Sequence, residues 1–465
     1  MVDSIGAWTV AIESRAPWSD SLSDHRTLST VDPITPATER MLGLSDALFG
    51  IAITFLALDF GSEVPKTSDG VSEYLVGNIP QYLAYVFAFL VVGFQWWKHH
   101  WVFRFIKKRT DTLLLLNSTL LAFVALTPFG MQVLGEDIGG PIALSFFAGL
   151  MVCIGTMLWV IWEYAVRNRL TIPDLDRRIV LHMRLRLILM PASFLLIMSV
   201  AIAAEILQWH HDGLGLLLLL VLLSGIASRR FNAPSVGIIE REIDGDLDDR
   251  NPRADRSLLA RIRDGSRSER LTVFTDGVFA VAFTIMALRL APPQSAIRSG
   301  AELVEAASAN SSALIAYFIT FYVLSAQWTR HVRLFDRMLI ADTGLLWINL
   351  ILLMFVAFMP FATDLTTDPG GRTAVMLYLV VLSATTITQM TMEVYASRRS
   401  MAATHQDHRQ LVNLRTRRVG VLLILATAAT LGMTMPVPEW GLYALILFTI
   451  LEPVVRKISP IPATP

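Results

Sequence analysis

The chain has 465 residues, of which 54% are hydrophobic and 17% are charged, and its formal net charge at pH 7 is zero. A soluble protein would carry about a quarter charged residues, so this composition indicates an integral membrane protein. The neutral net charge gives no reason to expect a nucleic acid partner. No Cys or His spacing typical of a metal site occurs, so we expect no metal and no cofactor.

The first 38 residues are polar, with several Asp, Ser and Pro residues, and they lack the basic start and apolar stretch of a signal peptide. We predict that residues 1–38 form a disordered cytoplasmic tail. Beyond them, apolar runs long enough to cross a bilayer, roughly 17–25 residues, recur along the chain. They predict an all-α membrane protein with about twelve transmembrane helices, at 44–60, 82–102, 113–134, 142–164, 185–204, 213–228, 273–291, 311–329, 343–362, 374–394, 417–435 and 439–455.

A strongly charged stretch at 231–268 divides these spans into two sets of six. It predicts a cytoplasmic linker that contains a short helix over 253–264. We therefore expect one six-helix unit at 39–230, a second at 269–457, and a C-terminal tail at 458–465.

Basic residues gather in alternate connections between the predicted spans. The connections after the second and fourth spans of each half hold Lys98, Arg104, Lys107, Lys108, Arg109, Arg167, Arg169, Arg177, Arg178, Arg184, Arg186, Arg330, Arg333, Arg337, Arg398, Arg399, Arg409, Arg415, Arg417 and Arg418. The other connections are acidic or neutral, apart from Lys66, Arg298 and Arg372. Because cytoplasmic loops carry the excess of Lys and Arg, both termini should face the cytoplasm. Six spans per unit is an even number, so the two units should share one orientation.

The two halves repeat each other in sequence. Residues 39–58 align without gaps to residues 269–288, and eight of these twenty positions are identical. A second block repeats at nearly the same offset, in which Trp96, His99, Phe103, Asn117 and Pro128-Phe129 match Trp328, His331, Phe335, Asn349 and Pro360-Phe361. Duplication of one unit follows from this agreement. The two prolines are expected to end or kink their spans near the outer surface.

The start of each unit resembles the signature of the lysosomal potassium channel family and its bacterial relatives, which is Arg-x-x-x-Phe-Ser-Asp. It reads Arg40…Leu44-Ser45-Asp46 in the first unit and Arg270…Phe274-Thr275-Asp276 in the second. The Trp-x-x-His after the second span and the Leu-Asn…Pro-Phe in the third are similar to other marks of that family. Leu in place of Phe and Thr in place of Ser are mild departures that remove no charge.

The resemblance implies a potassium channel whose pore is lined by the first helix of each unit. An apolar residue five positions after the Asp would form the constriction, which places it at Ile51 and Val281. On a helical wheel these two residues share a face with further pore-lining candidates, Thr54, Phe55, Leu58, Thr284, Ile285 and Leu288. An apolar ring opposes hydrated ions, and nearby hydroxyls can replace lost hydration. The same stripe is also compatible with ordinary helix packing.

Ionisable residues inside a span are costly and are usually paired. We therefore predict a buried structural polar network in each unit, formed by Arg40, Ser45, Asp46, His99 and Asn117 and by Arg270, Thr275, Asp276, His331 and Asn349. A direct ion site at the pore mouth is the alternative role for the two Asp residues. His99 and His100 are neighbours on a helix and point about 100° apart, so a metal site is not expected there.

Four copies of the first helix are needed to surround a pore, so a chain that supplies two of them implies a homodimer with pseudo-fourfold symmetry. The alternative function is secondary active transport, because some carriers also have two parallel six-helix halves. Residues 98–111 lack the Gly- and Arg-rich motif of such carriers, and carboxylates within the spans are scarce. An enzyme is less favoured, since no nucleophile–base constellation clusters or repeats.

The compartment is suggested only by composition. Five of the 39 basic residues are Lys, a bias typical of GC-rich genomes. It favours a bacterial cell membrane over a lysosomal or endosomal one. Gating, the potassium-to-sodium ratio and proton permeability are left open by the sequence.

Overall fold

The structure is a computed structural model that describes residues 36–58, 67–136, 140–171, 177–208, 252–290, 311–338 and 342–398, together with a few isolated positions. The predicted tails and the predicted spans at 213–228, 417–435 and 439–455 lie outside these residues or almost wholly so. Within the described part, regular structure is helical, apart from a 3-10 turn at Ser68–Gly70 and one isolated bridge between Ile106 and Thr171. The predicted all-α class is confirmed there.

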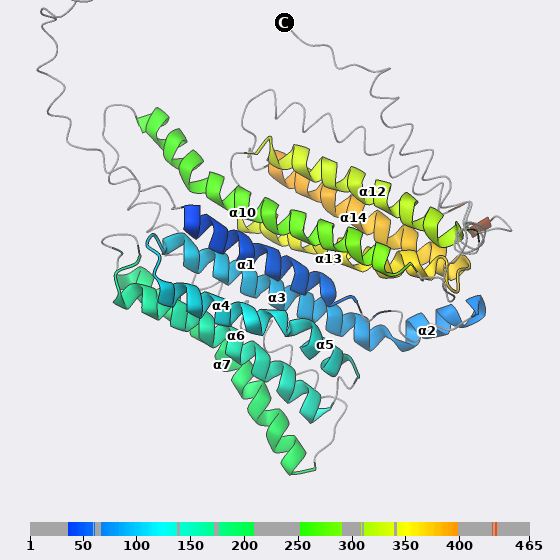
Figure 1. The fold of residues 1–465 in the computed structure, drawn as a ribbon, viewed down its shortest axis with the longest axis horizontal. Coiled ribbons are helices and arrows are strands. Elements are labelled where there is room, and N and C mark those ends of the chain that lie inside the picture. The colour runs from blue at the N-terminus through cyan, green and yellow to red at the C-terminus, as the bar shows by residue number, and fades with distance from the viewer. Residues whose placement is uncertain are drawn as a thin grey trace, which may run out of the picture.

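The first half contributes seven α-helices and the second half four to the described part of the chain. Those of the first half are α1 (Pro36–Phe55), α2 (Val71–Gly77), α3 (Ile79–Phe105), α4 (Asp111–Ala125), α5 (Thr127–Glu136), α6 (Pro141–Arg167) and α7 (Arg177–Ile206). Those of the second half are α10 (Pro252–Leu288), α12 (Ser311–Phe335), α13 (Thr343–Leu365) and α14 (Arg372–Arg398). Helices α1 and α10 lie side by side in the middle, with α3, α4, α6 and α7 on one side and α12, α13 and α14 on the other (Figure 1).

Eight helical segments of the described part are long and apolar enough to cross a membrane. They are Ile79–Phe105, Asp111–Gly135, Pro141–Arg167, Ile179–Ile206, Arg270–Leu288, Ser311–Phe335, Thr343–Leu365 and Arg372–Arg398. Each coincides with a predicted span to within a few residues at most ends. The chain is therefore an integral, multi-pass membrane protein.

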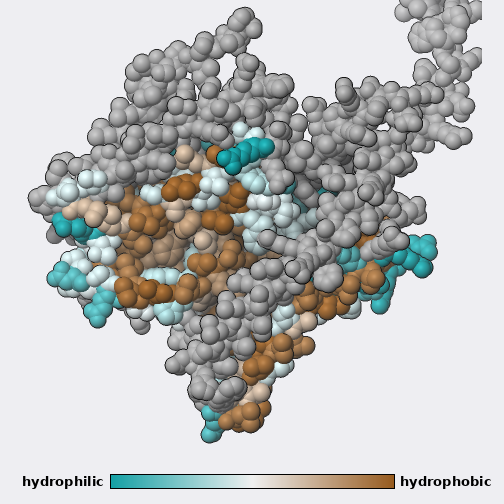
Figure 2. All heavy atoms as spheres, turned by 180° about the vertical axis from the view of Figure 1, so that it is seen from behind, coloured by the Kyte–Doolittle hydropathy of each residue, from teal (hydrophilic) through white to brown (hydrophobic). Residues whose placement is uncertain are grey.

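The outer surface is apolar, as a bilayer requires. Leu83, Leu115, Ile142 and Leu185 are each more than 60% exposed. Figure 2 shows hydrophobic side chains spread over the described part of one face, with hydrophilic ones towards its edges. A soluble monomer rarely exposes apolar patches of this extent, whereas lipid contact stabilises them.

Helix α10 differs from the prediction. A short linker helix over 253–264 and a separate span from 273 were expected, but one continuous helix runs from Pro252 to Leu288. Proline fits the first helical position because its missing N–H has no partner there, and no further proline interrupts the chain up to Leu288. The first membrane helix of the second unit therefore extends into the linker.

The two prolines of the third spans also act differently from each other. In the first unit α4 ends at Ala125, and Pro128 lies in the first turn of a new helix, α5. In the second unit Pro360 lies inside α13, which continues to Leu365. Only the first proline accompanies a break between two helices.

Helix caps repeat between the units, as the duplication predicts. The Thr110 hydroxyl caps α4 by accepting from the Leu113 N–H at 3.2 Å, and the Asp342 carboxylate caps α13 by accepting from the Leu345 N–H at 2.8 Å. A tyrosine from a later helix contacts each cap: Tyr164 lies 3.1 Å from Thr110, and Tyr395 donates to Asp342 at 2.7 Å. Such caps satisfy N–H groups that a helix start leaves unpaired.

Candidate pore helices and their polar support

The Arg and Asp of one signature cannot pair with each other. They lie six residues apart on one helix, which places them about 120° apart around it and about 9 Å along it. Each charge must therefore find its partner on another helix. The structure places such a partner in the other unit for Asp46 and Arg270.

Arg270 of α10 forms a bidentate ion pair with Asp46 of α1. Its Nε donates to Asp46 Oδ2 at 2.9 Å, and its NH2 group donates to Oδ1 at 2.6 Å. Trp96 of α3 donates from Nε1 to Oδ1 at 2.8 Å. The Asp46 side chain is 1% exposed and that of Arg270 is 13% exposed. Paired, charge-assisted hydrogen bonds of this kind are the arrangement that makes a buried carboxylate tolerable.

A chain of hydrogen bonds continues from this ion pair. The Asn117 amide nitrogen donates to the Ser45 hydroxyl at 3.0 Å, and Ser45 donates to the Met41 carbonyl at 2.9 Å. The Asn117 carbonyl oxygen then accepts from His99 Nε2 at 3.0 Å. His99 Nδ1 is left as an acceptor, and Arg270 NH2 lies 3.2 Å from it. The network of the first unit thus closes through a residue of the second.

The second unit repeats these hydrogen bonds, except for those that Arg270 donates in the first unit. Trp328 Nε1 donates to Asp276 Oδ1 at 2.7 Å. His331 Nε2 lies 2.9 Å from Asn349 Oδ1, and the Asn349 amide donates to Thr275 at 2.8 Å. Asp276 is exposed, and so is Arg40, the counterpart of Arg270. Neither makes an ion pair with another described residue.

The structure therefore brings most of the predicted network residues together. It leaves out Arg40, which is exposed. Each unit holds its own Trp, His, Asn and hydroxyl beside its Asp, as the spacing indicated. The contact between Arg270 and Asp46 crosses from one unit to the other and was not predicted. The six-residue spacing of Arg and Asp was the signal that could have found it.

The predicted pore face divides into residues that are accessible in both units and residues that are not. Ile51 is 41% exposed and Val281 is half-buried, while Leu58 and Leu288 are 39% and 79% exposed. Phe55 is half-buried, whereas its counterpart Ile285 is 3% exposed. A residue that lines a shared pore should be accessible in both units. Ile51 with Val281, and Leu58 with Leu288, meet this condition.

The two threonines do not behave alike. Thr54 is fully buried, and its hydroxyl donates to the Gly50 carbonyl at 2.7 Å. Thr284 is exposed, and its hydroxyl donates to the Val281 carbonyl at 2.9 Å. Thr54 and Ile285 thus pack inside the chain, off the exposed stripe on which the helical wheel had placed them.

An arginine joins the C-terminal ends of α1 and α10, and the sequence analysis did not predict it. Arg289, just after α10, donates to the carbonyls of Leu58 at 2.6 Å and Phe60 at 2.8 Å, and to Asp364 Oδ2 at 2.9 Å. One guanidinium therefore holds the C-terminal ends of α1, α10 and α13 together. At the aligned position the first unit has Asp59, so this contact is not duplicated.

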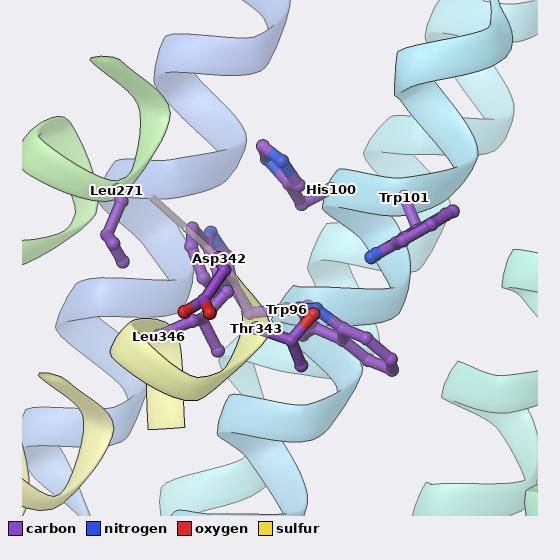
Figure 3. A pocket seen from close by; sticks show the side chains of 8 residues that line it. Trp96, His100, Trp101, Leu271, Asp342, Thr343 and Leu346 are labelled. Carbon is purple, nitrogen blue, oxygen red and sulfur yellow. The ribbon is translucent and has the colours of Figure 1, made fainter. Parts of the chain in front are cut away.

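A small pocket lies beside the polar network, between the units. Figure 3 shows side chains from three helices around it: Trp96, Trp97, His100 and Trp101 of α3, Leu271 of α10, and Asp342, Thr343 and Leu346 at the start of α13. The carboxylate of Asp342 is already used by the α13 cap and by Tyr395. No group of three His, Cys, Asp or Glu side chains that could hold a metal ion occurs within the described residues.

The duplicated segments match a known family. The model of the endosomal/lysosomal potassium channel TMEM175 matches residues 40–128 and again residues 270–360, so each match begins at a signature arginine. A potassium channel of Streptomyces collinus is 31% identical over 182 residues, which are 38% of this chain and 87% of that one. The chain belongs to the TMEM175 family. It carries two TMEM175 repeats, and the family is one of ion channels and not of enzymes.

Other TMEM175 relatives extend over more of the chain. The mouse endosomal/lysosomal proton channel TMEM175 is 26% identical over 370 residues, which are 72% of this chain and 67% of the mouse protein. The crystal structure of a lysosomal potassium-selective channel TMEM175 homologue from Chamaesiphon minutus superposes with a TM-score of 0.36 at 23% identity, over 41% of this chain and 98% of that one.

Proposed function

We propose that this protein is a channel that conducts potassium ions passively across a membrane, through a pore lined by α1 and α10. Membership of the TMEM175 family supports a channel, and the Streptomyces relative is named a potassium channel. The mammalian relatives are named proton channels, so protons are proposed as a second permeant ion. The single observation that carries the proposal is the duplicated signature helix, of which the two copies, α1 and α10, lie side by side where the units meet (Figure 1).

The proposed constriction is the apolar pair Ile51 and Val281, with Leu58 and Leu288 about two turns further out. These are the stripe residues that both units leave accessible. An apolar ring narrow enough to remove water opposes ion passage, which is how hydrophobic constrictions gate. Phe55 and Thr284, each accessible in one unit only, stay candidate lining residues. Thr54 and Ile285 are left out because they are buried within the chain.

The proposed assembly is a homodimer, in which two copies supply four pore helices. Within each copy we propose two parallel units at 39–230 and 269–457, with twelve spans and both termini in the cytoplasm. The charge distribution of the connections supports this orientation. A bacterial cell membrane is the proposed location.

Current recordings from the purified protein in a planar bilayer test the proposal, with potassium on one side and sodium on the other. We expect unitary current steps and a reversal potential that favours potassium. A second recording under a pH gradient with impermeant buffer ions measures the proton current. A saturable flux that requires a counter-transported solute or a proton gradient would show a carrier and overturn the channel.

A further inference from the structure

Two basic side chains are packed between α3 and α7 without an acidic partner. Lys98 of α3 is 3% exposed, and its ammonium donates to the Met190 sulfur at 3.1 Å and lies 5.0 Å from the centre of the Phe94 ring. A thioether is a weak acceptor. Arg186 of α7 is half-buried, and its buried Nε has no hydrogen-bond partner. Within the described part of the chain, neither side chain forms an ion pair.

The two cations belong to one site. Arg186 and Met190 are one turn apart on α7, and Trp97 and Lys98 are neighbours on α3. The guanidinium of Arg186 lies 4.2 Å from the centre of the Trp97 ring and 5.6 Å from that of Trp101. The charges of Arg186 and Lys98 are close enough to repel each other. Aromatic faces attract a cation but bring no net negative charge, so the site keeps two positive charges.

Other arginines of the same structure have carboxylate partners. Arg270 pairs with Asp46, and Arg184, only two residues before Arg186, donates to both oxygens of Glu163 at 2.8 and 2.9 Å. An unpaired charge inside a membrane span is costly, and its presence there indicates a functional site. The missing partner of Arg186 is therefore an anion that the described part of the chain does not supply.

The site adjoins the lipid-facing surface of α7. Leu185 and Ile188 are exposed on that surface, and Arg186 lies beside them. Arg104 adds a third positive charge, 5.7 Å from the Trp101 ring that also contacts Arg186. A ligand that reaches Arg186 along α7 therefore needs an anionic group and an apolar part.

The depth of the site also fits a lipid head group. Lys98 precedes the end of α3 at Phe105 by seven residues, which is about 10 Å along the helix. A lysine or arginine at this depth can extend its apolar stem towards the interface and bring its charge to the level of the phosphates.

We propose that an anionic phospholipid binds between α3 and α7. Its phosphate accepts hydrogen bonds from the Arg186 guanidinium and the Lys98 ammonium, and its acyl chains lie along Leu185 and Ile188. Charge-assisted hydrogen bonds to phosphate are strong, and a guanidinium forms two of them in parallel. In the orientation proposed above, the site faces the cytoplasmic leaflet, where basic pockets between membrane helices hold anionic head groups. Free phosphate offers the same acceptor oxygens, and the apolar approach favours the lipid.

Native mass spectrometry of the delipidated full chain measures the binding. The probes are phosphatidylglycerol as the anionic lipid, phosphatidylcholine as the zwitterionic lipid and inorganic phosphate as the free anion. The wild type should bind phosphatidylglycerol at least tenfold more tightly than phosphatidylcholine. Arg186→Gln and Lys98→Gln should each weaken phosphatidylglycerol binding about tenfold, as loss of a hydrogen bond to a charged group does, and the double variant should bind both lipids alike.

Arg109→Gln and Lys108→Gln are the matched controls, because both residues are exposed just beyond α3 and lose the same charges. They should change the binding by less than twofold. Equal affinity of the wild type for the two lipids, or equal effects of control and site variants, would overturn the proposal. Inorganic phosphate that binds at this site while phosphatidylglycerol does not would show a free anion and would also overturn it.

Thermal unfolding tests the site in variants that keep the side chains long and apolar. Without lipid, Lys98→Met with Arg186→Met should unfold at the wild-type temperature or above it, because buried charges without partners are removed. Phosphatidylglycerol should raise the wild-type midpoint above its value in phosphatidylcholine and leave the double Met variant unchanged, since a ligand stabilises only a protein that binds it.

Two other roles of the cations predict a different result. If they only pack on the aromatic rings, the Met variant loses stability equally in both lipids. If acidic residues of 240–249 in the same chain are their partner, the Met variant loses stability without lipid, and phosphatidylglycerol does not change the wild-type midpoint. Either result would overturn the lipid site and leave the proposed channel function standing.

Discussion

Asp46 is the residue at which the two units depend on each other. Its carboxylate accepts from both Arg270 and Trp96 while it is nearly inaccessible to solvent. Removing the negative charge from such a pair leaves a guanidinium with little water to solvate it. The cost of the remaining charge exceeds the cost of the lost hydrogen bonds.

We therefore expect Asp46→Asn to lower the free energy of unfolding by about 3 kcal/mol. Ser45→Ala, which removes a neutral donor from the same network, should cost about 1 kcal/mol. Thermal unfolding in detergent measures both, with Asp69→Asn as an exposed control that should leave the midpoint unchanged. Equal effects of Asp46→Asn and Asp69→Asn would contradict a structural role for the ion pair.

The constriction is tested by making it polar. Replacing Ile51 and Val281 with Asn should let water remain between the pore helices, so conductance should rise and discrimination between potassium and sodium should weaken. Single-channel conductance and the bi-ionic reversal potential measure the two effects. The change is expected to leave folding intact, because Ile51 is 41% exposed in the chain.

The control for this pair lies on the opposite face of each helix. Ile53 is 0% exposed, and Phe283 packs on Phe321 with ring centroids 4.8 Å apart. Ile53→Val with Phe283→Leu should reduce stability or expression and leave selectivity unchanged. If this pair alters selectivity and the Asn pair does not, the pore face has been assigned wrongly.

Sequence reasoning at the residue scale found which side chains form the network but not which unit each one serves. Repetition identified Trp96, His99 and Asn117 because their spacing recurs. It could not identify the partner of Asp46, because a duplicated sequence is equally consistent with contacts inside one unit and between two. The burial of Thr54 could not be predicted for a similar reason. A helical wheel gives the direction in which a side chain points, but the neighbouring helices determine whether that side chain is buried.

At the scale of elements, the close approach of α1 and α10 depends on a glycine. The Cβ of any other residue at position 50 would lie 3.3 Å from the Phe274 carbonyl and 3.5 Å from the Val278 nitrogen, both of which are backbone atoms that cannot turn aside. Small residues at such crossings let membrane helices pack without a gap.

Gly50→Val should therefore push α1 away from α10 and lengthen the contact between Arg270 and Asp46, at a cost of about 2 kcal/mol. Gly43→Ala is the matched control on the same helix, because nothing lies within 4 Å of an added Cβ there. It should leave stability unchanged or raise it by up to about 1 kcal/mol through helix propensity. Thermal midpoints in detergent measure both, and a larger loss for Gly43→Ala would contradict the packing described.

The spans themselves were predicted well because hydrophobic length is set by the bilayer. Elements that leave the bilayer were predicted less well. The extension of α10 back to Pro252 is rich in charged residues, which an apolar window does not recognise. The different behaviour of Pro128 and Pro360 reflects their neighbours. The span expected at 44–60 is a helix only as far as Phe55 and is not among the eight segments. It stays a prediction, as do the spans expected at 213–228, 417–435 and 439–455.

At the scale of the whole molecule, duplication explains why the two units share their helices and polar contacts. One contact, made by Arg289, is not duplicated. Arg289 joins the C-terminal ends of α1, α10 and α13 within one chain, while the aligned residue of the first unit is Asp59. Because residue 59 is an aspartate, the C-terminal end of α1 has no arginine that could donate to a second copy in the same way. In the proposed homodimer, the C-terminal ends of the four pore helices should therefore be joined by Arg289 within each chain and not between chains.

Parallel units with cytoplasmic termini make a prediction about which loops are accessible from each side of the membrane. Single cysteines in the Cys153→Ser background can be placed at exposed positions, with Asp69 and Asp368 expected outside and Lys108 and Asp336 expected inside. A membrane-impermeant maleimide on intact cells should label the first two, and the last two only after permeabilisation. Each position lies in a connection between helices, so substitution should not disturb packing.

Labelling of the inner pair alone would reverse the orientation but keep the units parallel. Labelling of Asp69→Cys together with Asp336→Cys would show that the units are antiparallel, and a pore shared equally by α1 and α10 could not then form.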